Sequence, residues 1–259
     1  MEGARILTLA VLQGLTEFLP VSSSGHLVLA RAWLGVAAPG ATLEVALHLG
    51  TLLTVAWVYA APLADLAAGL WRGGPGRRLA AQLAVATLPA ALAGLAAGDW
   101  ITARFTPAMA GWGWAGTTLL LALTPPPARS RVHRLTEVPW ATAAAIGLGQ
   151  ALALWPGLSR SGTTIVIARL GGLDPETAAA FSFLLGVPAV AGAVGLEFLR
   201  RPPLAVTGWP WLAAAVAVAA LAGAVAVQWV QHALTRPAAW RGFAVYTALL
   251  AGLGWWTGR

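Results

Sequence analysis

Residues 13–26 read QGLTEFLPVSSSGH, and we interpret the rest of the chain as the scaffold that holds this stretch. It places an amide, a carboxylate, three serine hydroxyls and an imidazole inside a very apolar sequence. Ionisable groups are costly in hydrocarbon, so a cluster of them in a membrane protein indicates a functional site. A second stretch, PGLSRSGTT at residues 156–164, supplies the cation that the first stretch lacks.

The composition predicts an all-α integral membrane protein. Of 259 residues, 58% are hydrophobic and 10% are charged, whereas a soluble domain carries about 25% charged residues. The mean hydropathy is +0.74, and the 14 Trp are typical of membrane interfaces. The absence of cysteine excludes disulfides and thiolate chemistry. The net charge of +7 comes from arginines in short gaps between apolar runs, which favours a membrane pattern over nucleic-acid binding.

Six apolar runs approach the roughly 20 residues that a spanning helix needs. We expect transmembrane helices over residues 42–61, 79–97, 107–123, 176–199, 210–231 and 238–257. The first of these is expected to end at Pro62. Asp174 is a suitable N-cap for the fourth run, and Pro175 suits its first helical position.

Two further apolar stretches, residues 5–33 and 140–170, are interrupted near their middle. Pro20 and a serine run break the first, and Pro156 with a hydroxyl-rich run breaks the second. Each half is too short to cross a bilayer alone. We therefore expect two re-entrant helix–loop–helix hairpins, because irregular backbone at membrane depth must be buried in protein or beside a water-filled cavity.

The two interrupted stretches resemble each other after a shift of 137 positions. The shift aligns Gln13 with Gln150, Leu15 with Leu152, Ser22 with Ser159, Ser24 with Ser161 and Gly25 with Gly162. Each hairpin is followed by three expected spans, so the second half must enter the membrane with the opposite orientation. The sequence thus predicts an inverted-topology repeat of residues 1–125 and 138–259 within one membrane domain, residues 1–259.

The distribution of arginine predicts the orientation of this membrane domain. On the expected topology, nine arginines of the connecting segments lie on one side and six on the other. The richer side is expected to be cytoplasmic, with both termini outside. We expect a multi-pass protein of the cell (inner) membrane whose site opens to the outer, periplasmic side.

Arg160 is the first candidate for binding an anion. Its guanidinium matches two phosphate oxygens at once, and a helix beginning near Gly162 would direct free N–H groups at the same anion. The alternative is that Arg160 only neutralises the buried charge of Glu17. Four hydroxyls flank the arginine and could donate to a phosphate or diphosphate: Ser159, Ser161, Thr163 and Thr164.

Glu17 precedes the break of the first hairpin, where its carboxylate could be a general base or a ligand of Mg²⁺ or Ca²⁺. Gln13 lies one helical turn earlier on the same face and could orient it. The alternative is a helix-end carboxylate in the headgroup region. Glu44 and His48 also share one helix face, and they could pair with each other near the site or form part of a cavity wall.

His26 follows the serine run and could be nucleophile, general acid or general base. The alternative is a wetted side chain near the interface. Ser23 and Ser24 could contact phosphate or attack it, while Ser22 could cap a helix. The sequence leaves these roles of the serines open.

The two stretches resemble the undecaprenyl-diphosphate phosphatases, also called bacitracin-resistance proteins. The first family motif has Glu or Gln, three residues, then Glu, and here Gln13 and Glu17 are followed by FLPVSSSGH. The second motif is complete over residues 156–164. Residues 181–188 and 43–50 are also similar to the family, although Gln is expected where His48 stands. The resemblance covers nearly the whole chain.

The resemblance implies removal of the terminal phosphate from undecaprenyl diphosphate, which yields the monophosphate lipid carrier for peptidoglycan. It also implies a divalent cation, Mg²⁺ or Ca²⁺, with Glu17 as its ligand. A carboxylate pair is absent, since Gln13 takes the Gln option of the motif. The expected partners are a polyprenyl diphosphate and the bilayer, and a homodimer is left open. The carried-over functional positions are Glu17, Ser23, His26, Ser159, Arg160 and Thr164.

A lipid-phosphate transporter or flippase is the alternative function. Inverted repeats with broken helices near the midplane are typical of transporters, and a pair of phosphate-binding hairpins could move a lipid phosphate without cleaving it. Release of inorganic phosphate from a lipid diphosphate distinguishes the two functions.

Overall fold

The computed structural model describes residues 2–34, 41–125, 130–200 and 209–259. These residues are helical apart from short connections, which confirms the all-α prediction. The helices are α1 (Glu2–Phe18), α2 (Ser23–Leu34), α3 (Ala41–Val58), α4 (Ala60–Arg72), α5 (Pro75–Thr102), α6 (Pro107–Ala122), η2 (Leu135–Glu137, a 3₁₀ turn), α7 (Trp140–Leu152), α8 (Arg160–Leu170), α9 (Pro175–Arg200), α10 (Trp209–Leu234) and α11 (Pro237–Thr257).

One helix differs from the expectation. The first expected span does not end the helical structure at Pro62: α3 ends at Val58, the chain bends by 83°, and α4 begins at Ala60. Pro62 lies in the first turn of α4, where a missing N–H removes no intrahelical hydrogen bond. Pro62 therefore lies at the start of a new helix, α4, and does not end the helical segment as expected.

The start of α9 follows the expectation. The carboxylate of Asp174 accepts the backbone N–H of Thr177 at 2.8 Å, and Pro175 is the first helical residue. An N-cap of this kind satisfies one of the backbone donors that a helix leaves free at its N-terminus.

Several helices are suited to a bilayer. By length and composition, α5, α10 and residues Pro175–Leu196 of α9 could each cross a membrane, and α3 with α4 would add a fourth span if the bent pair counts as one. These spans are found within the described residues, and they indicate a multi-pass membrane protein. The number of six spans and the re-entrant path of the hairpins stay predictions.

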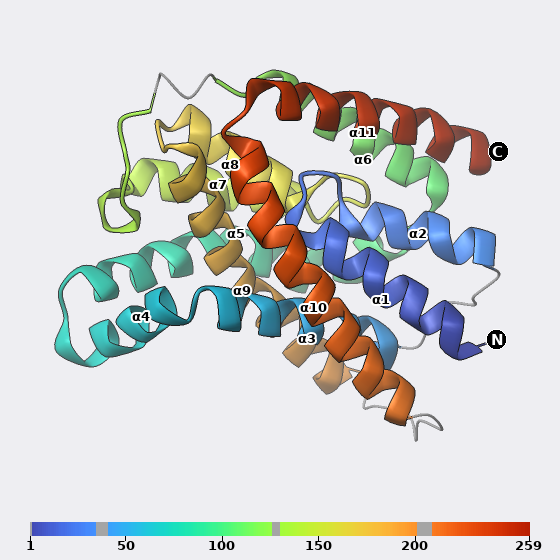
Figure 1. Ribbon diagram of the computed structural model, residues 1–259, viewed down its shortest axis with the longest axis horizontal. Helices are drawn as coiled ribbons and strands as arrows, with labels where there is room; N and C mark the ends of the chain where they lie inside the picture. The colour runs from blue at the N-terminus through green and yellow to red at the C-terminus, as the bar shows by residue number, and fades with distance from the viewer. Residues whose placement is uncertain (1, 35–40, 126–129, 201–208) are drawn as a thin grey trace.

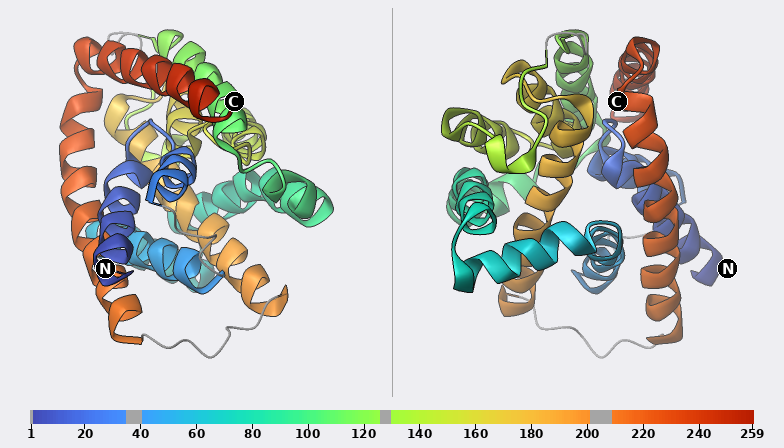
Figure 2. Two further views of the ribbon diagram at one scale, coloured as in Figure 1. Left: turned by 90° about the vertical axis from the view of Figure 1, so that its right-hand side faces the viewer. Right: turned by 60° about the vertical axis from the view of Figure 1, so that its left-hand side comes forward.

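The helices pack in pairs around two helical hairpins. Helices α1 and α2 form one hairpin and α7 and α8 the other, and their connections approach each other in the middle of the molecule (Figure 1). Helix α1 packs on α10, and α7 packs on α5. Helices α6 and α11 lie side by side along the top of Figure 1 and also in both views of Figure 2.

The second helix of each hairpin begins with the same cap. The hydroxyl of Ser22 accepts the N–H of Gly25 at 3.4 Å. The hydroxyl of Ser159 accepts the N–H of Gly162 at 3.0 Å. Each capping hydroxyl also lies 3.2 Å from the hydroxyl of the serine two positions later. Two segments 137 positions apart are thus built alike, and the suggestion that Ser22 caps a helix is confirmed.

Close backbone contact fixes the connection between α7 and α8 against α6. A Cβ atom on Gly113 would lie 2.0 Å from the carbonyl oxygen of Pro156, so only glycine fits there. Gly157 has φ +84°, in the left-handed region. The Thr117 hydroxyl donates to the Gly157 carbonyl at 3.0 Å and accepts the N–H of Ser159 at 2.9 Å. Helix α6 therefore positions the start of α8.

We predict that Gly113→Ala lowers the stability of the protein by about 1–3 kcal/mol, because the added methyl group forces helix α6 away from the α7–α8 connection. Gly94→Ala is the matched control, since a Cβ at this helical position meets nothing within 4 Å. Thermal unfolding of the detergent-solubilised variants measures the effect. Equal midpoints for the two variants would show that this contact is not tight.

Candidate active site

The carboxylate of Glu17 lies at the centre of the candidate site. Glu17 is in the last turn of α1, and its side chain is 8% exposed. Its Oε1 accepts from Nη2 of Arg160 at 2.6 Å. Its Oε2 accepts from Nε2 of Gln13 at 3.0 Å and from the hydroxyl of Ser23 at 2.5 Å. The carboxylate thus connects the two hairpins, and Gln13 orients it as the helical spacing suggested.

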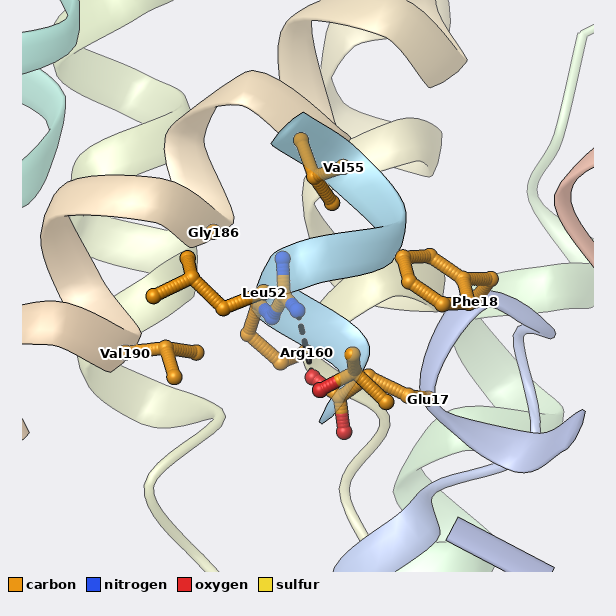
Figure 3. Close-up of a pocket in the computed structure, with 8 residues that line it drawn as sticks. Glu17, Phe18, Leu52, Val55, Arg160, Gly186 and Val190 are labelled. Atoms are coloured by element: carbon orange, nitrogen blue, oxygen red, sulfur yellow. Dashed lines mark hydrogen bonds and ion pairs between the residues drawn. The ribbon is translucent and has the colours of Figure 1, made fainter. Parts of the chain in front are cut away.

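Arg160 is the first residue of α8 and reaches across to helix α9. Besides its ion pair with Glu17, its Nη1 donates to the carbonyl oxygen of Ser182 at 3.1 Å. Gly186 lies one turn further along α9, and a Cβ there would approach Nη1 to 2.8 Å. Figure 3 shows the guanidinium between Gly186 and the Glu17 carboxylate. The glycine provides the space that this position of the arginine requires.

A pocket opens beside the ion pair (Figure 3). One side of the pocket is the charged pair, and most of the other side is apolar. The pocket itself is about the size of one water molecule, so it is an opening beside the ion pair and not a chamber for a whole ligand. The lining residues come from α1, α3, α8 and α9 and are Glu17, Phe18, Thr51, Leu52, Val55, Arg160, Gly186 and Val190.

Ser23 is presented to Glu17 by a strained turn. Ser22, which precedes it, has φ +68° and is the one non-glycine residue with positive φ in the described part of the chain. This conformation is uncommon for residues with a Cβ and persists where the surroundings hold it. One anchor is the indole N–H of Trp114, which donates to the carbonyl of Val21 at 2.8 Å. The turn places the Ser23 hydroxyl against the buried acid.

His26 lies on the other side of this turn. Its Nδ1 is 2.7 Å from the carbonyl oxygen of Ser22, and its Nε2 is 2.8 Å from the hydroxyl of Tyr246. Its ring also meets Trp114 edge-on, with ring centroids 5.6 Å apart. The imidazole therefore contacts the turn and α11, while the hydrogen bonds of Glu17 go to other residues. A direct role of His26 in the reaction stays a prediction.

The hydroxyls around Arg160 form hydrogen bonds within the protein. The Ser161 hydroxyl donates to the carbonyl of Leu19 at 2.8 Å and thereby joins the two hairpin connections. The Thr164 hydroxyl lies 2.6 Å from that of Ser182. The Thr163 hydroxyl is buried and has no hydrogen-bond partner in the described structure. Substrate contacts of these hydroxyls and of Ser159 and Ser24 stay predictions.

Glu44 and His48 are not joined through their side chains. The carboxylate of Glu44 pairs with Arg31, and Nδ1 of His48 bonds to the backbone carbonyl of Glu44 at 2.8 Å. His48 is nevertheless within electrostatic range of Glu17. His48 lies one turn before the pocket residue Thr51, and neither Glu44 nor His48 lines the pocket, so their place in a cavity wall stays a prediction.

The sequence reasoning missed several residues of the site. Ser182 and Gly186 fall in the segment 181–188, which was noted only for its family resemblance. Tyr246 had no signal beyond its rarity, since the chain has two tyrosines. Trp114 was one of many tryptophans. Each of these residues acts through a contact with a distant segment, which no local pattern reveals.

The side chains beside Glu17 offer a hard divalent cation one oxygen that has no hydrogen-bond partner in the described structure. The Gln13 side chain donates through its nitrogen, and its Oε1 is buried without a hydrogen-bond partner in the described structure. Carboxylate and amide oxygens are ligands for Ca²⁺, and Mg²⁺ commonly takes one or two carboxylates together with substrate phosphates. Among the described residues no group of three or more His, Cys, Asp or Glu side chains is suited to a metal. Any cation here would therefore depend on oxygens from the substrate.

The fold and the site define a multi-pass helical membrane protein in which a buried acid pairs with an arginine beside a small pocket and accepts a hydrogen bond from a serine. The sequence model of one family, described as bacitracin resistance protein BacA, matches residues 6–253. The chain belongs to this family.

Three relatives carry the name undecaprenyl-diphosphatase. The chain is 34% identical to one from Desulfatibacillum aliphaticivorans, with 93% of each chain covered. It is 37% identical to one from Cereibacter sphaeroides, covering 96% of this chain and 91% of the relative. It is 40% identical to undecaprenyl-diphosphatase 1 of Agrobacterium fabrum, covering 75% and 74%.

We predict that Glu17→Gln and Arg160→Met each destabilise the protein by up to about 3 kcal/mol, because each leaves a charge without its partner, either the 19% exposed Arg160 or the buried Glu17. The double variant should recover part of this loss, which thermal unfolding can measure. The control is the pair Arg31 and Glu44, whose carboxylate is 44% exposed and whose removal should cost less than about 1 kcal/mol. Strictly additive losses at Glu17 and Arg160 would contradict the coupling.

Proposed function

We propose that this protein hydrolyses undecaprenyl diphosphate to undecaprenyl phosphate and inorganic phosphate. The observation that carries the proposal is the contact of 2.5 Å between the Ser23 hydroxyl and a carboxylate whose other oxygen pairs with Arg160. The names of the relatives support it, and the family name implies resistance to bacitracin. The product is the lipid carrier used in peptidoglycan synthesis.

Ser23 is the nucleophile in this proposal, and Glu17 is its general base. Glu17 takes the hydroxyl proton while Oγ forms a bond to the terminal phosphorus. The bond between that phosphorus and the bridging oxygen breaks, and undecaprenyl phosphate leaves. Water then attacks the phosphoserine, which releases inorganic phosphate and restores the hydroxyl. Attack by water or by His26 has less support, because Ser23 is in contact with the acid and Nε2 of His26 is bound to Tyr246.

Arg160 stabilises the charge on the phosphate in this mechanism. A guanidinium has five N–H donors, and the contacts with Glu17 and Ser182 use two of them. The remaining donors can bind phosphate oxygens while the ion pair is kept. Charge spreads over the equatorial oxygens during phosphoryl transfer, so a fixed cation next to them lowers the barrier.

In this proposal the isoprene chain begins at the apolar part of the pocket and lies outside it, because the pocket itself is about the size of one water molecule. Phe18, Leu52, Val55 and Val190 line this part, and lipid lies outside the helices. We also propose a membrane topology of six spans and two re-entrant hairpins in an inverted repeat. The matching caps of α2 and α8 and the matching helix pairs α1–α10 and α7–α5 support the repeat.

The proposed location is the inner membrane, with the site open to the periplasmic side. This orientation rests on the arginine count, in which Arg129 and Arg201 lie outside the described residues. A homodimer stays a prediction.

A divalent cation bound by Glu17 and Gln13 is part of the proposal. When bound, the cation would neutralise charge on the diphosphate oxygens. The chain's own part is to orient the two oxygen ligands: Gln13 does so by donating its N–H to Glu17.

We expect Arg160→Ala to lower kcat about 10²- to 10³-fold, the loss typical of removing a donor to a developing oxyanion. Ser23→Ala and Glu17→Ala should lose activity at least as strongly, since they remove the nucleophile and its base. The assay is release of inorganic phosphate from undecaprenyl diphosphate by purified protein in detergent. Arg134→Ala, an exposed arginine, is the control.

The same assay tests the alternative of a transporter. A lipid transporter releases no phosphate, so wild-type protein without hydrolysis would contradict the phosphatase proposal. Near-normal turnover in all three site variants would instead show that hydrolysis occurs at another place.

We expect removal of divalent cations by a chelator to abolish phosphate release, and Mg²⁺ or Ca²⁺ to restore it. Gln13→Leu should raise the cation concentration for half-maximal activity, because it removes an oxygen ligand. The control is Gln150→Leu at the position related by the repeat, where the amide donates to the Ala86 carbonyl. Unchanged activity in the chelator, or the same response in both variants, would exclude the proposed cation site.

A further inference from the structure

Tyr246 connects helix α11 to the turn that presents the proposed nucleophile. Its hydroxyl lies 2.8 Å from Nε2 of His26. The two rings also stack, with centroids 5.8 Å apart and an interplanar angle of 19°. The mechanism above assigns this tyrosine no part, although it is the residue in contact with the free nitrogen of His26.

The hydrogen bonds of His26 determine its tautomer. A backbone carbonyl only accepts, so Nδ1 must carry the proton that is shared with Ser22. In the neutral ring Nε2 is then an acceptor, and the Tyr246 hydroxyl must donate to it. The three residues form one directed chain, from the Tyr246 hydroxyl through the imidazole to the Ser22 carbonyl.

The end of this chain is the strained residue of the site. Ser22 has φ +68°, and the carbonyls of Val21 and Ser22 are both held by side chains from outside the turn or from α2. Trp114 of α6 holds the first carbonyl directly, and Tyr246 of α11 acts on the second through His26. Helices α6 and α11 pack against each other, and the hydroxyls of Thr118 and Thr247 lie 2.8 Å apart between them.

We infer that Tyr246 is a positioning residue for the reaction: its hydroxyl holds the His26 ring in the orientation in which Nδ1 donates to the Ser22 carbonyl, and so keeps Ser23 against Glu17. The inference rests on the proposed function, because it concerns the geometry of the proposed nucleophile. On this inference, helices α6 and α11, which lie outside the two hairpins, stabilise the left-handed turn at Ser22. A strained backbone needs such external contacts to persist.

The test compares the two tyrosines of the chain. Tyr246→Phe removes only the hydroxyl and keeps the stacked ring. Tyr59→Phe is the matched control, because its hydroxyl also has one side-chain partner, Gln231 at 2.6 Å, and that contact lies away from His26. Tyr246→Phe should lower kcat for phosphate release about three- to ten-fold, the effect of one hydrogen bond, with KM changed less than two-fold. Tyr59→Phe should leave both values unchanged.

A measurement independent of activity examines the hydrogen bond at Nε2 of His26 itself. Nitrogen NMR of protein labelled at its four histidines reports the unprotonated ring nitrogen of His26, which His26→Asn identifies by its loss. This resonance should move in Tyr246→Phe and stay in place in Tyr59→Phe. In a His26→Asn background, Tyr246→Phe should cause no further fall in kcat, since the chain is already broken.

The outcomes separate this inference from the proposed function. If wild-type protein releases no phosphate, the proposed function fails, and the nitrogen spectrum still decides whether Tyr246 fixes His26. If wild-type protein is active but Tyr246→Phe matches Tyr59→Phe in kcat and in the spectrum, the inference is wrong. An equal fall of kcat with and without His26 would also overturn it, because Tyr246 would then act by another route.

Discussion

A buried carboxylate needs hydrogen-bond donors, and Glu17 has three of them. The donors come from its own helix, from the start of α2 and from the start of α8. Burying a charge without such partners is costly, so the two hairpins are stable only when their connections lie together. The same arrangement brings a serine hydroxyl, a carboxylate and a guanidinium together, and the carboxylate and the guanidinium line one pocket.

One chain builds this site from two similar hairpins. Ser23 and Arg160 are related by the shift of 137 positions, each is the first residue of its helix, and both donate to Glu17. The position related to Glu17 is Leu154, so one hairpin alone carries the acid. The two capping serines accept the same hydrogen bond but differ in backbone, with φ +68° at Ser22 and −64° at Ser159. They precede two different side chains, a hydroxyl and a cation. The difference between the halves, on a shared local structure, creates a single site.

Two kinds of contact hold the surroundings of the site: close packing at glycines, and hydrogen bonds from polar side chains to the backbone. Glycines permit close contacts: Gly113 admits the α7–α8 connection against α6, and Gly186 admits the guanidinium against α9. Hydroxyls and amides then hold the approaching backbone segments, as Ser161 does at the carbonyl of Leu19. Sites built on such contacts are rigid. A rigid site holds its reacting groups in the geometry of the reaction, so no conformational entropy is lost to align them when substrate binds.

The sequence by itself determined the helical class, the two broken hairpins, the caps at Ser22 and Asp174, and the shared face of Gln13 and Glu17. Each of these follows from residues within a few positions of one another, where periodicity, proline and capping hydroxyls act. Only the tertiary structure decided the 83° bend before α4, the carbonyl that holds Arg160, and the contact of His26 with Tyr246. These depend on segments up to 220 positions apart, whose approach is set by the packing of the whole molecule and by no local pattern.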